Sequence, residues 1–225
     1  MIEVIPGILE KEWEMIEERL RLVTGLVDWV QLDFADNTLV PNTTFLDFSR
    51  FTRHASARLP KTGTVGQASV AGGPQLEAHF MVANPEKYIK AAVDAGFKRV
   101  IAQVEAHDPR LFLDAAKHEE VEVGIAIDGP TEFEAVEPFL EEVDFVLVMM
   151  VEAGFSGGTF LPECLEKIKS IHSYLPDLPI EADGGISDKT ARLVTEAGAT
   201  RLVSTSFLFR DPANIAGAID RLKSV

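Results

Sequence analysis

The sequence predicts a (β/α)8 TIM barrel, an α/β fold in which parallel strands alternate with helices. Apolar runs of strand length alternate with amphipathic helical runs from one end to the other, and eight such units can be counted. The chain has 225 residues, which is the usual size of one compact barrel. No linker or low-complexity tract divides it, so residues 1–225 are expected to form a single domain.

The expected strands are short apolar runs bounded by polar, proline or glycine residues. They begin almost at the amino terminus and recur along the whole chain. The eight strands are expected at Glu3–Leu9, Trp29–Asp36, Leu76–Val82, Arg99–Ala106, Val121–Asp128, Phe145–Val151, Pro179–Ile186 and Arg201–Phe209.

Amphipathic runs between these strands predict the outer helices. Several begin with Pro or Thr, which favour a helix start, and Gly96 and Gly198 stand where two helices should stop. The clearest helices are expected at Glu10–Val23, Pro85–Ala95, Thr131–Glu142, Pro162–Tyr174, Thr190–Ala197 and Pro212–Lys223.

Two stretches interrupt the alternation of strands and helices. Asn37–Asp47 follows the second strand and is rich in Asn, Thr and Pro, which predicts a long loop over the carboxyl-end face of the barrel. Lys61–Gln75 is rich in Gly and precedes the third strand, so it is expected at the opposite face. Loops of the first kind build active sites in barrels, whereas the second kind bears on stability or on a contact in a homo-oligomer.

Composition and charge exclude several classes of partner. The formal net charge of −15 and the pI near 4.7 oppose nonspecific attraction to nucleic acid or to an anionic membrane. The sequence has neither a long apolar run nor a basic segment ahead of an apolar one, so we expect a cytoplasmic protein without a membrane span. The lone Cys164 lies in a helical pattern without a ligand partner and is interpreted as a packing residue.

Two carboxylates are expected at the mouth of the barrel. Asp33 lies near the end of the second strand, and alternation places it on the inward face. Asp183 lies at the same level of the seventh strand, on the far side of the barrel. Two carboxylates that face each other across a pocket suit proton transfer at opposite faces of one carbon. The alternative is that each caps a helix or binds backbone.

His79 is a single polar side chain inside the apolar third strand. A histidine in such a place is more often a hydrogen-bonded core residue than a ligand. The sequence alone does not fix its distance from Asp33 and Asp183.

Glycine and hydroxyl residues follow three consecutive strands at their carboxyl ends. Glycines let the backbone approach an anion closely, so a phosphate can be bound without a Lys. This suits an acidic chain, although tight turns alone would also account for each segment. The residues are Gly154, Ser156, Gly157 and Gly158 after the sixth strand, Gly184 and Gly185 after the seventh, and Thr205 and Ser206 on the eighth.

These features together resemble the ribulose-phosphate 3-epimerase family nearly from end to end. The resemblance implies a divalent metal such as zinc, iron or manganese, held by two His and two Asp, with the two Asp also serving as acid and base. It implies that the glycine loops hold a sugar phosphate, which makes the fold a ribulose-phosphate-binding barrel. The matching stretches are Ile5–Leu9, Asp33–Asp36, Val40–Asn42, Ala78–Val82 with Asn84-Pro85, Val104–Ala106, Val146–Met149, Gly154–Gly158 and Asp183–Ile186.

Carried onto this chain, the resemblance assigns Asp33 and Asp183 as acid, base and metal ligands, and His79 as a metal and substrate ligand. The departures cluster around them. The second metal-binding His of the family is Gln31 here, so we expect weakened or absent metal, because an amide oxygen is a poorer ligand than imidazole. The other departures are Gly7 for a Ser, Ala35 for a Met, Gln103 for a His, Glu152-Ala153 for Asn-Pro and Thr205 for a Gly.

The leading hypothesis is an isomerase that epimerises a phosphorylated ketose, similar to ribulose 5-phosphate, by proton transfer between two aspartates. One alternative is a related phosphosugar lyase; lyases of that kind place a Lys where this chain has Ala35. The other is a non-catalytic barrel that binds a phosphosugar. In each case the expected partner is a small sugar phosphate.

Overall fold

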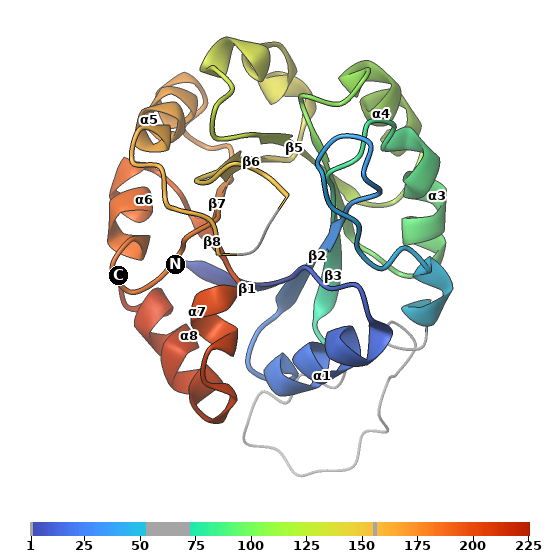
Figure 1. Cartoon of the computed structure of the whole chain (residues 1–225). Helices are drawn as coiled ribbons and strands as arrows, with labels where there is room; N and C mark the ends of the chain where they lie inside the picture. The colour runs from blue at the N-terminus through green and yellow to red at the C-terminus, as the bar shows by residue number, and fades with distance from the viewer. Residues whose placement is uncertain (1, 53–72, 155–156) are drawn as a thin grey trace, which may run out of the picture.

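Eight parallel strands close into a barrel in the order of the sequence, and helices form a ring around it (Figure 1). The computed structural model describes residues 2–52, 73–154 and 157–225. The strands are β1 (Glu3–Ile8), β2 (Trp29–Phe34), β3 (Gln75–Phe80), β4 (Arg99–Gln103), β5 (Glu122–Ile127), β6 (Phe145–Met149), β7 (Ile180–Asp183) and β8 (Arg201–Ser204). The predicted TIM barrel is confirmed.

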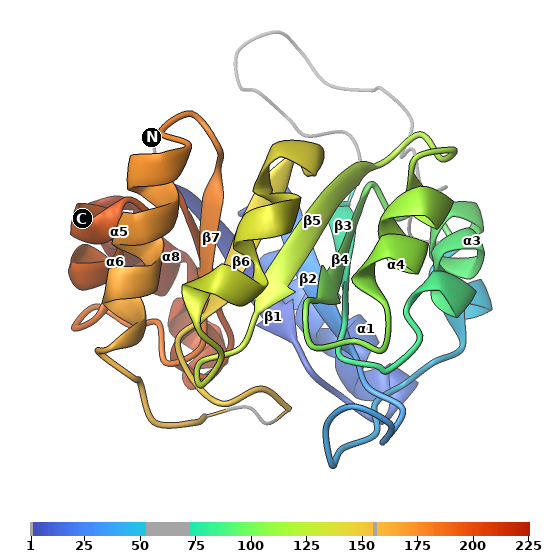
Figure 2. The same ribbon diagram turned by 90° about the horizontal axis from the view of Figure 1, so that it is seen from above.

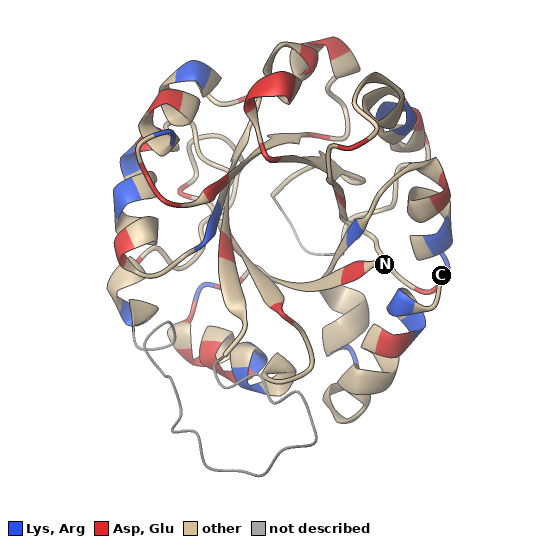
Figure 3. Ribbon diagram, turned by 180° about the vertical axis from the view of Figure 1, so that it is seen from behind, with Lys and Arg blue, Asp and Glu red and all other residues tan. Residues whose placement is uncertain are grey.

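Seven α-helices are present in the described part of the chain. Their inward faces pack on the sheet, and their outer faces carry interspersed acidic and basic residues (Figure 3). None of these helices is long and apolar enough to cross a membrane. They are α1 (Trp13–Val23), α3 (Glu86–Asp94), α4 (Pro109–Ala116), α5 (Cys164–Tyr174), α6 (Ala191–Ala197), α7 (Ser206–Phe209) and α8 (Ile215–Lys223), joined by short 3-10 helices at Phe48–Arg50, Phe133–Ala135, Glu137–Glu142 and Pro212–Asn214.

Two sequence-based assignments were wrong, and the bounds of one helix were not assigned. The last strand does not reach Phe209 but ends at Ser204, because the chain turns there into the short helix α7. Thr131–Glu142 is not a continuous helix but two 3-10 turns, and Pro138 cannot donate the backbone hydrogen bond that an α-helix would need. The helix without assigned bounds is α4, although Asp108 caps it by accepting from the amide of Arg110 at 3.0 Å.

The loop after β2 lies over the carboxyl-end face, as its composition indicates. Figure 2 shows it on the same side of the barrel as the loop after β6. The side chain of Asn42 donates to the carbonyl oxygen of Gly154 at 2.7 Å and so joins these two loops. Of the glycine-rich stretch Lys61–Gln75, only the last three residues belong to the described part of the chain.

A buried ionic cluster fills the barrel at the amino ends of the strands. The guanidinium of Arg99 lies 3.5 Å from the centre of the Trp29 ring and 3.1 Å from Glu77 Oε2. Glu181 accepts from Arg201 at 2.8 Å, and both Glu77 and Glu181 are fully buried. Burial and the neighbouring Glu181 carboxylate raise the pKa of Glu77 well above its usual value. Two arginines therefore hold two buried carboxyl groups beneath the barrel mouth.

We expect Arg99→Met to lower the free energy of unfolding by about 3–5 kcal/mol, because it leaves buried carboxyl groups without their counter-charge. Urea denaturation followed by circular dichroism measures this. Arg192→Met is the control, since Arg192 pairs with Glu196 at 2.8 Å on the exposed surface of α6 and should cost less than about 1 kcal/mol. Equal losses in the two variants would contradict a supporting role for the cluster.

Candidate functional site

The barrel brings Asp33 and Asp183 to one point at its mouth. Asp33 lies near the end of β2 and Asp183 ends β7, and each is only 9% exposed. The side-chain nitrogen of Gln31, also on β2, donates to Asp33 Oδ1 at 2.8 Å and to Asp183 Oδ2 at 2.9 Å. One amide group therefore bridges both carboxylates.

His79 lies beside Asp33, on the neighbouring strand, and is fully buried. The register of β2 and β3 pairs the two residues, and His79 Nδ1 lies 2.9 Å from Asp33 Oδ1. Its other ring nitrogen, Nε2, lies 3.0 Å from the side-chain nitrogen of Gln103 on β4. A hydrogen-bonded chain thus runs from Gln103 through His79, Asp33 and Gln31 to Asp183.

Burial and mutual repulsion shift the acid–base properties of this cluster. Burial, followed by the nearby Asp33 charge, raises the pKa of Asp183 to about 7. Burial lowers the pKa of His79, but the hydrogen bond and the charge of Asp33 raise it by more. Two close carboxylates do not readily ionise together, so the aspartate pair is suited to hold one proton and one negative charge near neutral pH.

The glycine segments that the sequence singled out converge on the pocket that contains both aspartates. Its other walls are apolar side chains, among them Met81 and Met149, and His79 is not part of its lining. Ser156 lies outside the described residues. The predicted site residues that line the pocket are Asp33, Gly154, Gly157, Gly158, Asp183, Gly184, Gly185, Thr205 and Ser206.

The positive φ angles and the close packing after β7 require glycine there. Gly184 has φ +105°, and a Cβ there would lie 2.5 Å from a methyl group of Val151. Gly185 has φ +64°, and its carbonyl accepts from Thr190 Oγ1 at 2.8 Å. A tight turn therefore accounts for both glycines, and it is the convergence of three segments on one pocket that indicates an anion site.

Gly7 and Thr205 fit against each other across β1 and β8. A Cβ at Gly7 would lie 2.5 Å from Thr205 Oγ1 and 3.1 Å from a methyl group of Val203. The Thr205 hydroxyl therefore occupies the space that a side chain at position 7 would need. The two positions, which both depart from the pattern of the resembled family, therefore adjoin each other in this fold.

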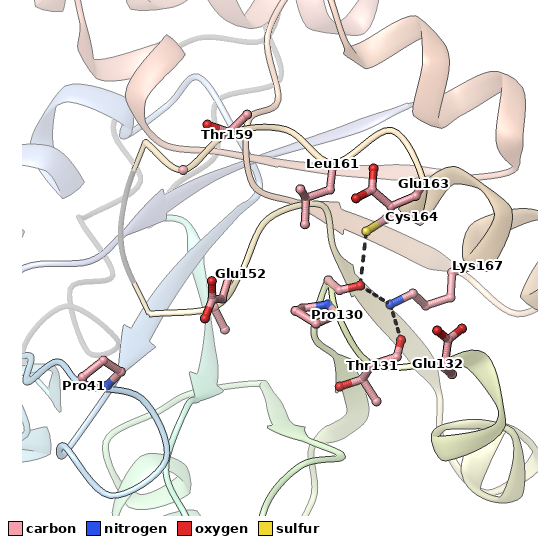
Figure 4. A pocket seen from close by; sticks show the side chains of 13 residues that line it. Pro41, Pro130, Thr131, Glu132, Glu152, Thr159, Leu161, Glu163, Cys164 and Lys167 are labelled. Atoms are coloured by element: carbon pink, nitrogen blue, oxygen red, sulfur yellow. Dashed lines mark hydrogen bonds between the residues drawn. The ribbon is translucent and has the colours of Figure 1, made fainter.

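A second hollow of about 800 Å³ opens beside the first, between the segments that follow β5 and β6 (Figure 4). No pattern in the sequence predicted this hollow. Among the described residues of its lining, Lys167 is the only lysine, and it donates to the backbone carbonyls of Asp128, Gly129 and Thr131 at 2.6, 3.0 and 2.5 Å. The three ammonium hydrogens of Lys167 are all used on carbonyls of the segment after β5, so none is left for a ligand. Three glutamates also line this hollow, so it does not favour a phosphate.

The donor atoms of Asp33, His79 and Asp183 lie within 4.8 Å of one another, close enough for one divalent ion. Gln31 does not complete the set, because its amide hydrogens point at both carboxylates. Its Oε1 is buried and has no hydrogen-bond partner among the described residues. The four residues therefore do not fit the metal site of two His and two Asp that the resemblance implies.

Comparison with known proteins gives consistent matches. The Ribulose-phosphate 3 epimerase family matches residues 3–209. A ribulose-phosphate 3-epimerase of Schizosaccharomyces pombe is 31% identical over 211 residues, which cover 92% of this chain and 86% of that protein. For the ribulose-phosphate 3-epimerase of Bacillus subtilis, the identity is 30% over 233 residues, with coverage of 100% and 97%.

Among solved structures, 3-hexulose-6-phosphate synthase from Salmonella typhimurium superposes with a TM-score of 0.70 over 99% of this chain and 97% of that one. The sequence identity is 13%, so the likeness shows the barrel fold alone.

Proposed function

Because the chain belongs to the ribulose-phosphate 3-epimerase family, we propose that it epimerises a phosphorylated ketose similar to ribulose 5-phosphate. The observation that carries the proposal is the placement of Asp33 and Asp183. Both carboxyl groups line one pocket, and the glycine segments line the same pocket.

In the proposed reaction, an ionised aspartate removes the proton from the carbon beside the ketone. The electrons of the broken C–H bond form the double bond of an enediolate, and the carbonyl oxygen takes the negative charge. The second aspartate, which enters protonated, then delivers its proton to the opposite face of the same carbon. The carbon is inverted, and the two aspartates have exchanged protonation states.

His79 supports this reaction through Asp33. It contacts Asp33 at 2.9 Å and does not line the pocket, so the direct substrate contact suggested by the resemblance has no support in this geometry. A hydrogen bond from the ring holds the carboxylate in one orientation. His79 is therefore a positioning residue in this proposal.

The phosphate of the substrate is assigned to the glycine segments. Backbone N–H groups can bind it there together with the hydroxyl groups of Thr205 and Ser206. No Lys or Arg belongs to the described lining of this pocket, so backbone and hydroxyl donors must supply the binding. The segments concerned contain Gly154, Gly157, Gly158, Gly184 and Gly185.

We expect Asp33→Asn and Asp183→Asn each to lower the epimerase rate by about 10²- to 10⁴-fold, because each deletes one of the two proton-transfer groups. An amide can still accept the hydrogen bond from Gln31, so circular dichroism and thermal unfolding should show an intact fold. The exposed Asp94→Asn serves as the control and should keep full activity with ribulose 5-phosphate. Unchanged turnover in either site variant would refute the two-aspartate mechanism.

For the phosphate site, we expect Gly157→Ala to weaken the binding of inorganic phosphate roughly tenfold, which isothermal titration calorimetry measures. Gly25→Ala is a closely matched control. Both glycines have φ +81°, and at neither would a new Cβ meet an atom of another described residue within 4 Å, so the backbone strain is equal. If the two variants bind phosphate equally well, the glycine segment after β6 is not part of the anion site.

A further inference from the structure

We propose that Gln31 and Gln103 organise a metal-free acid–base site, in which hydrogen bonds instead of a cation hold His79 and the two aspartates in place. Only the acid–base role of the aspartates rests on the proposed function. The hydrogen-bond arrangement itself can be tested without any turnover.

Gln103 fixes the tautomer of His79. An amide nitrogen donates hydrogen bonds and does not accept them, so the 3.0 Å contact makes His79 Nε2 the acceptor. The ring proton must then lie on Nδ1, from which it is donated to Asp33 Oδ1 at 2.9 Å. A second proton on the ring, at Nε2, would face the amide hydrogens of Gln103.

This tautomer leaves no ring nitrogen of His79 free for a metal. The lone pair of Nε2 accepts from Gln103, and Nδ1 carries the hydrogen. A ligating imidazole must offer a lone pair to the ion. The same hydrogen bonds that orient Asp33 therefore occupy the nitrogen that would bind zinc or manganese.

Gln31 holds the two carboxylates together, as a bound cation would otherwise do. Each hydrogen of its amide group is used, one on Asp33 and one on Asp183. Turning the amide over would place its oxygen against the aspartate pair, which keeps one negative charge, and that repulsion favours the observed orientation. The oxygens of Gln31 and Gln103 are both buried without a partner among the described residues, so each amide acts only as a donor.

The first test is the tautomer of His79 in the intact protein at pH 8. Long-range ¹H–¹⁵N spectra distinguish the ring forms, and the His79 signals are identified by their loss in His79→Asn. We expect the neutral ring with its proton on Nδ1. In Gln103→Met this preference should weaken, whereas the matched Gln75→Met, at the exposed start of β3, should leave it unchanged. A proton on Nε2, a doubly protonated ring or a metal-bound ring in the native protein would overturn the proposal.

The second test is metal binding to protein purified without added metal. Metal analysis and titration with zinc and manganese should show weak, substoichiometric binding, and Gln31→His should raise the affinity by about tenfold or more. Gln75→His is the control for a new surface imidazole. A full equivalent of tightly held metal in the native protein, or no gain in Gln31→His, would contradict the proposal.

Activity with ribulose 5-phosphate after chelation by EDTA separates the proposed epimerase function from the proposed metal-free site. Undiminished epimerisation supports both proposals. Loss of activity on chelation, with recovery when zinc or manganese is restored, overturns the metal-free site while the proposed function stands. Inactivity under all conditions, with the His79 tautomer and the weak metal binding as expected, rejects the function and leaves the arrangement of the two glutamines supported.

Discussion

The hydrogen bonds from the Gln31 amide to Asp33 and Asp183 are the interaction on which the candidate site depends. Two buried carboxylates this close repel one another, and each loses the hydration that would stabilise its charge. The amide offsets part of both costs, since it gives each carboxylate a donor at 2.8 to 2.9 Å. The repulsion that remains between Asp33 and Asp183 favours a state in which the pair holds one proton. A two-aspartate epimerase needs this state.

The rest of the barrel keeps this pair in place. The mouth carries the aspartates, and the amino end is closed by the ionic cluster around Arg99. The loop after β2 binds the loop after β6 through Asn42 and Gly154, and so supports the segment after β6 that lines the pocket. Polar groups at both ends of the barrel interior are thus fixed by partners on other strands, which gives the pocket a defined shape.

Much of this arrangement could be predicted from the sequence, because its signals are local. Strand periodicity placed Asp33 and Asp183 on inward faces, and the order of the strands placed the glycine segments at one end. The helix at Ser206–Phe209 was missed because its apolar residues also fit a strand, and the break at Pro138 because the pattern around it is helical.

Several positions at which this chain departs from the family pattern are far apart in the sequence but adjacent in the fold. Local sequence signals could not predict that adjacency. Gly7 and Thr205 are far apart in the chain, and only the fold shows that the hydroxyl of one fills the space above the other. Gln31 and Gln103 look like separate losses of histidine in the sequence. In space they bind the two ends of the pair formed by His79 and Asp33, and the direction of those hydrogen bonds depends on which atom of each amide faces inward.

In the proposed reaction, two opposed carboxyl groups move a proton on and off the carbon beside a ketone. The most direct measurement is the incorporation of solvent deuterium into ribulose 5-phosphate, followed by proton NMR with protein in deuterium oxide. If this proton transfer occurs, deuterium is expected at the carbon next to the ketone, together with the epimer, and no exchange is expected with Asp33→Asn. Ribulose 5-phosphate that binds to the protein and is recovered without deuterium would contradict it and would favour a barrel that only binds the sugar phosphate.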